Sequence, residues 1–294
     1  MKYKITHSTS YAYSSPVSVC HNLVMMTPRE DPRVHCLSHR LRIRPTPQVS
    51  GRRYDCFGNH VHSFSIEESH RKLTVMATSR VSVEQFELPA PESTPAWESL
   101  ASDEAAQRDP SWLNVAPFRF DSPRVQRSTE FADYARTAFT PSRSVLAAVL
   151  DLTATIHSDF AYDKQATLVD TPTEEAFRLR RGVCQDFAHV QIACLRSLGI
   201  PTRYVSGYLR TLPEAGKERL VGADQSHAWL SVYCGTAGWI DVDPTNNCVC
   251  STDHIPVAWG RDFGDVVPIK GVFLGGGEHI LSVSVDVLPL EKVD

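Results

Sequence analysis

The stretch TPTEEAFRLRRGVCQDFAHVQIACLRSLGIP, residues 171–201, decides the fold class of this chain. Thr171–Glu174 forms a capping-box pattern with proline at the first helical position, which predicts a helix that ends at Gly182. A second helix is predicted to start near Cys184, because apolar residues follow it at helical spacing. Gly199, with a proline two residues later, predicts the end of that helix. Two short helices therefore follow each other and meet at a cysteine.

The flanking segments complete a pattern of helices followed by strands. Upstream, apolar residues at helical spacing predict a helix from Ser144 to about Ile156. A surface loop around Pro213–Gly216 is expected farther along the chain. Helices first and strands afterwards predict an α+β core, with helices packed on an antiparallel sheet, rather than a parallel α/β sheet. Alternating polar and apolar residues predict the strands at 204–209, 226–233, 239–243 and 281–288.

The first ninety residues show a different pattern. Residues alternate with period two, as in Lys2–His7, and Asp55–Asn59 supplies a turn signal between strands. Six prolines lie between residues 89 and 123, which indicates a linker. The predicted division is an N-terminal antiparallel β domain at 1–90, a proline-rich linker with a short helix at 91–142 and the α+β core at 143–294.

Composition and charge restrict the class of protein. The chain has 294 residues, of which 42% are hydrophobic, so it can bury a sizeable core. The net charge of −4 argues against a surface that binds nucleic acid, although residues 1–90 are basic. No apolar run approaches the roughly 18 residues that a membrane helix needs, and no secretion signal is evident. We expect a cytoplasmic protein with no membrane partner, whose eight cysteines are reduced.

Cys184 is the most informative residue for chemistry. At a helix start, free N–H groups and the helix dipole stabilise the thiolate, which is the reactive form of cysteine. Arg180 and Arg181 add positive charge nearby. Taken alone, however, this position favours a buried cysteine that packs as a small hydrophobe.

A histidine and two aspartates downstream change that balance. His227 lies on one predicted strand, and Asp241 and Asp243 lie on the next. A nucleophilic thiol needs a base, and the base needs a group that fixes its tautomer. The two aspartates point to the same face of a strand, so the pattern itself leaves open which of them contacts His227.

These motifs, in this order, resemble the transglutaminase-like superfamily. The core motifs are Gly182–Ala188, Ser226–Trp229 and Gly238–Thr245. The resemblance extends to the N-terminal β region of bacterial members and covers nearly the whole chain, apart from the proline-rich stretch and the 211–223 loop. It is carried outside the core by Tyr3–His7, Tyr11–Tyr13, Asp55–Asn59, His70–Leu73, Gly260–Asp265 and Pro268.

The resemblance implies a papain-like core and a cysteine-dependent enzyme. It matches Cys184 to the nucleophile, His227 to the base and Asp243, directly before Pro244, to the orienting acid. It implies acyl transfer on a peptide or protein amide through a thioester. Hydrolysis, as in a cysteine protease or amidase, is the expected outcome. The alternatives are protein-glutamine transamidation, glycanase or acyltransferase chemistry on the same residues, and a non-catalytic binding module with a vestigial core.

Further residues are weaker candidates. Tyr162 is a candidate second oxyanion donor beside the Cys184 backbone N–H, or else a tyrosine with a packing role. Trp229 is expected either to pack beside His227 or to contact substrate. Asp262 is expected to pair with Arg261, with a position lining the cleft as the alternative.

No cofactor or metal is expected. Two groups of soft ligands lack the spacing of zinc sites, and no calcium loop of the EF-hand type is present. The soft ligands are Cys248, Cys250 and His254 in one group, and Cys20, His21, His35, Cys36 and His39 in the other.

The sequence leaves the oligomeric state of the protein open.

Overall fold

Strand β1 (Lys2–Val24) organises the N-terminal part of the protein. Its first half pairs with β5 and β14, and its second half pairs with β4 and β13. The exchange of partners occurs around Pro16, which has no N–H to donate and therefore lies where the ladder is interrupted. The other strands of this large sheet are β2 (Val34–Arg44), β3 (Val49–Tyr54), β4 (His60–Ile66), β5 (His70–Val83), β13 (Ile269–Gly275) and β14 (His279–Pro289).

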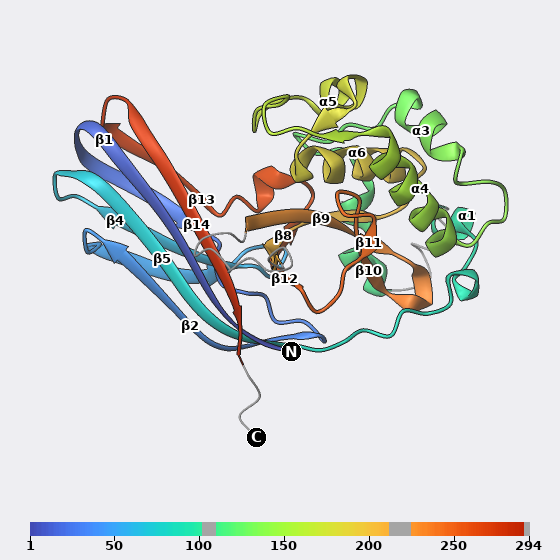
Figure 1. Ribbon diagram of the computed structural model, residues 1–294, viewed down its shortest axis with the longest axis horizontal. Coiled ribbons are helices and arrows are strands. Elements are labelled where there is room, and N and C mark those ends of the chain that lie inside the picture. The colour runs from blue at the N-terminus through green and yellow to red at the C-terminus, as the bar shows by residue number, and fades with distance from the viewer. Residues whose placement is uncertain (102–109, 212–224, 291–294) are drawn as a thin grey trace, which may run out of the picture.

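The computed structural model describes residues 1–101, 110–211 and 225–290, and the loop expected at 213–216 lies outside them. A second antiparallel sheet has the strand order β11-β10-β9-β8-β12, and helices lie along one side of it (Figure 1). None of the helices in the described part of the chain combines the length and apolar character needed to cross a bilayer. The strands of this core sheet are β8 (Thr202–Leu209), β9 (Gln225–Tyr233), β10 (Trp239–Asp243), β11 (Cys248–Val249) and β12 (His254–Gly260).

The helices confirm the pattern that the sequence predicts. Ser144 precedes α4 (Val145–Asp159), and α6 (Cys184–Ser197) begins at the cysteine. Helix α5 (Thr173–Leu179) ends before Gly182, because Arg180 adopts the left-handed conformation with φ 53°. The apolar side of α6 packs on β9 and β8 and is buried. The fold is therefore α+β, with helices on one antiparallel sheet and a second antiparallel sheet that contains the N-terminal strands.

The proline-rich stretch takes part in the core. It contains α1 (Trp97–Ala101) and α3 (Thr129–Arg136), and Phe131 of α3 is buried in the same apolar cluster as α6. A stretch that the sequence predicts as linker therefore packs against the central helix. Its 3₁₀ turns are η1 (Pro91–Ser93), η2 (Pro110–Asn114) and η3 (Ala116–Arg119).

The last strand corrects one expectation from the sequence. The segment around 281–288 was expected in the 143–294 core, whereas the structure places it in β14, paired with β1 from Tyr3↔Pro289 to Tyr13↔His279. Figure 1 shows β13 and β14 running beside β1. An alternating pattern predicts that a segment is a strand, but it does not identify the neighbour with which that strand pairs.

Buried polar contacts join the two sheets. Tyr3 donates its hydroxyl hydrogen to Asp253 Oδ1 at 2.8 Å. The His7 ring lies between Tyr208, with Nδ1 3.0 Å from the hydroxyl oxygen, and Thr9, with Nε2 3.2 Å from Oγ1. A neutral imidazole matches these partners, since it accepts at one nitrogen and donates at the other. Burial accordingly lowers the pKa of His7 from 6.5 to about 4.

We expect His7 to make the junction acid-sensitive. The folded state excludes a proton that the unfolded chain binds below pH 6.5, so this contribution to stability is present above that pH and declines toward pH 4. Between about pH 7.5 and about pH 5 the loss is about 2 kcal/mol of unfolding free energy. In urea denaturation, the unfolding free energy of His7→Gln should fall by about 2 kcal/mol less than that of the wild type between these two pH values. An equal loss in the variant and the wild type would contradict the assignment.

Candidate active site

Cys184 is the first residue of α6, where the local sequence forms a tight cap. Asp186 turns back and accepts the N–H of Val183 at 2.8 Å. A Cβ at Gly182 would clash with the Asp186 carboxylate, so glycine is required there. Among the described residues, the Cys184 N–H has no hydrogen-bond partner and remains available at the helix start. Cys184 itself is half-buried.

The β9–β10 hairpin brings His227 and Asp243 together. His227 Nε2 lies 2.7 Å from Asp243 Oδ2, as expected for the pair. Asp241 is engaged elsewhere, since its Oδ2 accepts the indole N–H of Trp229 at 3.0 Å and lies 3.5 Å from Arg33. The geometry thus resolves the choice that strand parity leaves open, in favour of Asp243.

Asp243 is completely buried but surrounded by donors. Its Oδ2 accepts Nδ2–H of Asn246 at 2.6 Å and Nε2–H of His254 at 3.1 Å, in addition to His227. Its Oδ1 accepts the backbone N–H of Thr245 at 2.9 Å. Burial would raise the pKa of Asp243, but the hydrogen bonds from His227, His254 and Asn246 hold it well below its usual range. The carboxylate is therefore a fixed negative charge.

The His227 ring has one nitrogen committed to Asp243. A carboxylate only accepts, so Nε2 carries a proton and Nδ1 is left for Cys184, which lies close enough to the ring to affect its pKa. Burial alone would lower the pKa of His227, but the interactions with Asp243 and Cys184 raise it to about 10. The structure thus favours an imidazolium beside Cys184 at neutral pH.

Tyr162 lies close to this group. It forms the short strand β6 (Ala161–Tyr162), which pairs with β7 (Arg181–Gly182) so that Tyr162 is opposite Gly182. The tyrosine is 47% exposed. Burial and the nearby Cys184 thiol raise the pKa of Tyr162, so its hydroxyl remains a hydrogen donor at neutral pH. Its location therefore fits the expected role of a second donor beside the helix start.

Trp229 lies beneath the site and has no surface to offer a substrate. Its side chain is completely buried, with its ring centroid 6.1 Å from that of His227. A Cβ at Gly207 would clash with the indole, so the glycine of β8 makes room for it. Of the two alternatives for Trp229, the structure supports packing beside His227.

His254 and Asn246 belong to the site, although the sequence offered no motif that identified them. His254 was considered only as a metal ligand beside Cys248 and Cys250. In the described part of the chain, the ligand-type side chains that come together are instead His227, Asp243 and His254, with ligand atoms within 4.8 Å. The carboxylate joins the two rings by hydrogen bonds, which is a sufficient account of their proximity.

One other sequence expectation, the pairing of Asp262 with Arg261, is wrong. Arg261 pairs with Asp265 at 2.9 Å rather than with Asp262. Asp262 is buried and instead caps η5 (Phe263–Asp265), where it accepts the Gly264 N–H at 2.8 Å. A side chain that caps its own turn cannot be distinguished by sequence from one that pairs with its neighbour.

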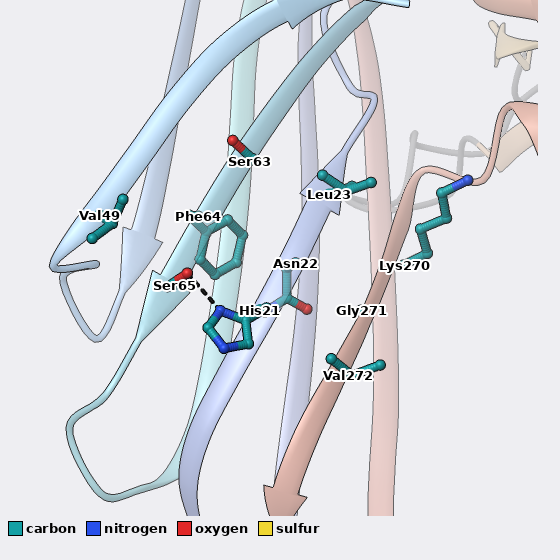
Figure 2. Close-up of a pocket in the computed structure, with 10 residues that line it drawn as sticks. All are labelled: His21, Asn22, Leu23, Val49, Ser63, Phe64, Ser65, Lys270, Gly271 and Val272. Atoms are coloured by element: carbon teal, nitrogen blue, oxygen red, sulfur yellow. Dashed lines mark hydrogen bonds between the residues drawn. The ribbon is translucent and has the colours of Figure 1, made fainter.

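The large sheet also carries cysteine and histidine side chains, and a cavity of about 330 Å³ on it is lined by Glu30, Cys36, His39, His60 and His62. Cys20 Sγ lies 4.0 Å from His70 Nε2, a cysteine–histidine contact that the sequence did not reveal, but burial raises the pKa of the Cys20 thiol. A shallow cavity of about 450 Å³ on this sheet is lined by neither a cysteine nor a carboxylate (Figure 2). Its histidine, His21, is engaged with Ser65 through Nδ1 at 2.7 Å.

Comparisons with known proteins match two parts of the chain to family profiles. Residues 3–82 match the family profile described as the bacterial transglutaminase-like N-terminal region. Residues 132–244 match that of the transglutaminase-like superfamily. The chain belongs to the transglutaminase-like superfamily. An uncharacterised protein of Mycobacterium tuberculosis (strain H37Rv) is 37% identical over 298 residues, which cover 99% of this chain and 93% of that protein.

Two further similarities concern an enzyme and a solved structure. A Pseudomonas aeruginosa protein-glutamine gamma-glutamyltransferase is 31% identical over 153 residues, covering 51% of this chain and 22% of that protein. A crystal structure from Cytophaga hutchinsonii, described as a candidate cysteine protease, has a TM-score of 0.76 at 23% identity. It covers 99% of this chain and 92% of that chain, and it supports the fold alone.

We expect the imidazole of His227 to remain protonated well above neutral pH. Histidine-selective NMR of the full chain, with the signal assigned by comparison with His227→Gln, should show titration near pH 10. Asp243→Asn removes the buried charge that favours the imidazolium, so the titration should move to lower pH by at least about one unit. A wild-type titration near the ordinary 6.5 would contradict the charge distribution described above.

Proposed function

We propose that this protein is a cysteine-dependent acyl-transfer enzyme that acts on peptide or protein amides, with water as the ordinary acceptor. The observation that carries the proposal is the arrangement around one imidazole, with Nε2 2.7 Å from a buried carboxylate and the Cys184 thiol close to the same ring. A base oriented by a third group is what a thiol nucleophile requires. The nucleophile is Cys184, the base is His227 and the orienting acid is Asp243.

The acylation half-reaction follows from these positions. The Cys184 thiolate attacks the amide carbonyl carbon and forms a tetrahedral intermediate. Nδ1–H of His227 then protonates the amine as the C–N bond breaks, leaving a thioester on sulfur. Asp243 stays ionised throughout and keeps the ring oriented through Nε2–H.

The oxyanion is stabilised at the start of α6. The Cys184 N–H has no partner among the described residues, so it can bond the developing negative charge, which the helix dipole also favours. Tyr162, opposite Gly182 and partly exposed, supplies the second donor through its hydroxyl. Among the residues that the structure describes, neither donor has another hydrogen-bond partner to leave when the reaction occurs.

Deacylation determines whether the enzyme hydrolyses or transfers. The open position of Tyr162 and the half-buried position of Cys184 favour access by water. His227 Nδ1 takes a proton from that water, the hydroxide oxygen adds to the thioester carbon, and the Cys184 thiolate leaves. Transamidation, in which an amine replaces water, is the second candidate. The similarity to the Pseudomonas glutamyltransferase favours it.

We also propose a cytoplasmic location for the protein. All eight cysteines are free thiols, which is the state that a reducing compartment maintains.

Limiting iodoacetamide at about neutral pH should label Cys184 before the other seven cysteines. Competition is weak at Cys248, where burial and Asp243 raise the pKa to about 11. Peptide mapping identifies the modified residue, and His227→Ala should slow its alkylation at least about tenfold. His21→Ala, in the exposed large sheet, is the matched control and should label as the wild type does. Preferential labelling of Cys20 or Cys248, or an unchanged rate in His227→Ala, would refute the proposed nucleophile.

A glutamine-containing peptide, with and without a primary amine, tests the fate of the acyl group. Mass spectrometry should show a thioester on Cys184 and release of free acid even when amine is present. Tyr162→Phe should slow acylation about 100-fold, the effect of losing one oxyanion donor, whereas the exposed Tyr54→Phe should not. A predominant amine adduct would establish transamidation instead. A folded wild type that forms no thioester with this peptide or with small activated esters would support the binding-module alternative.

A further inference from the structure

A second concave site lies at the far end of the core sheet from Cys184. It is a cavity of about 710 Å³ between the large sheet, η3 and the core sheet. Trp239 and Asp243 are the first and last residues of β10, so the cavity is about 13 Å along the strand from the candidate active site. The arginine–tryptophan cavity, as we call it, is lined principally by Arg29, Phe57, Arg203, Trp239, Trp259 and Arg261.

Guanidinium groups and indole rings stack in this cavity. Arg203 Cζ lies 3.6 Å from the centroid of the Trp259 ring and 4.4 Å from that of Trp239. Arg29 Cζ lies 3.4 Å from the Trp259 centroid. Such contacts orient each guanidinium through its flat face and leave its N–H edge for another partner. The edges of Arg29 and Arg203 are therefore the polar groups that the cavity can present to a ligand.

Arg203 has no counter-charge of its own. Among the described residues it forms neither a hydrogen bond nor an ion pair, and its Nε is buried without a partner. Asp241 is nearby, but its Oδ2 is engaged with Trp229 and Arg33. Burial lowers the pKa of Arg203 to about 10, partly offset by Asp241, so the group stays charged at neutral pH. A buried charge without a partner is costly and is satisfied by a bound anion.

Arg29 is in a similar situation. Its Nη1 donates to Asn59 Oδ1 at 2.8 Å, whereas its Nε is buried without a partner. The nearby Asp55 uses Oδ1 for the N–H groups of Phe57 and Asn59 and Oδ2 for the Asn59 amide. Burial lowers the pKa of Arg29 to about 10, opposed by Asp55 and Asp31. Arg29 therefore contributes a second positive charge without an ion-pair partner in the described part of the chain.

Other arginines of the fold show what a structural role looks like. Arg196 is almost completely buried, and its guanidinium donates to the carbonyl oxygens of Thr202 and Arg261 at 2.7 and 2.6 Å. Arg261, on the cavity wall, is paired with Asp265. Arg29 and Arg203 differ from both because a buried nitrogen of each has no acceptor.

We propose that the arginine–tryptophan cavity binds a small molecule through a dianionic phosphate group, held by the N–H edges of Arg29 and Arg203. Two guanidinium groups that have no ion-pair partner in the described part of the chain match two negative charges, and their planar N–H forks match phosphate oxygens. Trp239 and Trp259 offer apolar wall to the remainder of the ligand. The site is separate from Cys184, and the inference is independent of the acyl-transfer chemistry proposed above.

Phenyl phosphate is the probe that tests this site in the full-length protein. At constant ionic strength it should bind saturably by calorimetry and change the tryptophan fluorescence, and inorganic phosphate should compete with it. Arg203→Gln and Arg29→Gln should each weaken binding at least about tenfold, because each removes a charge-assisted contact. Arg203→Lys keeps the charge without the fork and should bind between the wild type and Arg203→Gln. The Trp239→Phe variant should still bind phenyl phosphate, but with a smaller change in tryptophan fluorescence than the wild type shows.

The controls separate this site from general attraction of anions. Arg136→Gln, an exposed arginine on α3 paired with Asp133, should bind phenyl phosphate as the wild type does. Succinate, a dicarboxylate, distinguishes phosphate recognition from recognition of any dianion. Circular dichroism verifies that each variant is folded. If Arg203→Gln does not fold, the effect of Arg29→Gln on binding tests the proposal. Absence of saturable binding, equal binding in all folded variants, or tighter binding of succinate than of phosphate would overturn the proposal.

Discussion

The hydrogen bond between His227 and the buried carboxylate of Asp243 is the interaction around which the core is arranged. A charge that is completely buried is stable only if donors surround it, and Asp243 has donors from β9, from the turn after β10 and from the start of β12. The strand order β10-β9-β8-β12 is what brings these segments together. The sheet thus has to form completely before the carboxylate is satisfied.

Packing beneath this group sets the position of Cys184. The apolar side of α6 is buried against β9 and β8, and its first residue is fixed by the Asp186 cap and by the absence of a side chain at Gly182. Trp229 fills the space under His227 because β8 has glycine at position 207. The thiol, the imidazole and the carboxylate therefore come from three elements whose spacing is set by close packing.

The large sheet packs against the core that carries this site. Its seven strands, counted among the described residues, include the last two strands of the chain, so the core segment lies between two parts of one sheet. His7 and Tyr3 connect that sheet to the core through polar contacts, with the Tyr208 hydroxyl and the Asp253 carboxylate. At the other end of the core sheet, Arg29 comes from the segment that follows β1 and lies over Trp259 of β12. The junction between the sheets therefore shapes the arginine–tryptophan cavity.

The sequence by itself determined the local elements and the candidate nucleophile, base and acid. Capping residues, glycine stops and period-two alternation depend on neighbours within a few positions, so α4, α5, α6 and most strands could be predicted directly. The motifs around Cys184, His227 and Asp243 identified the superfamily because their order and spacing are specific. Only the tertiary structure decided that Asp241 is engaged by Trp229, that His254 and Asn246 hold Asp243, and that β14 joins β1. These contacts join residues distant in the chain, and strand pairing and burial arise from the packing of the whole molecule, which no local pattern records.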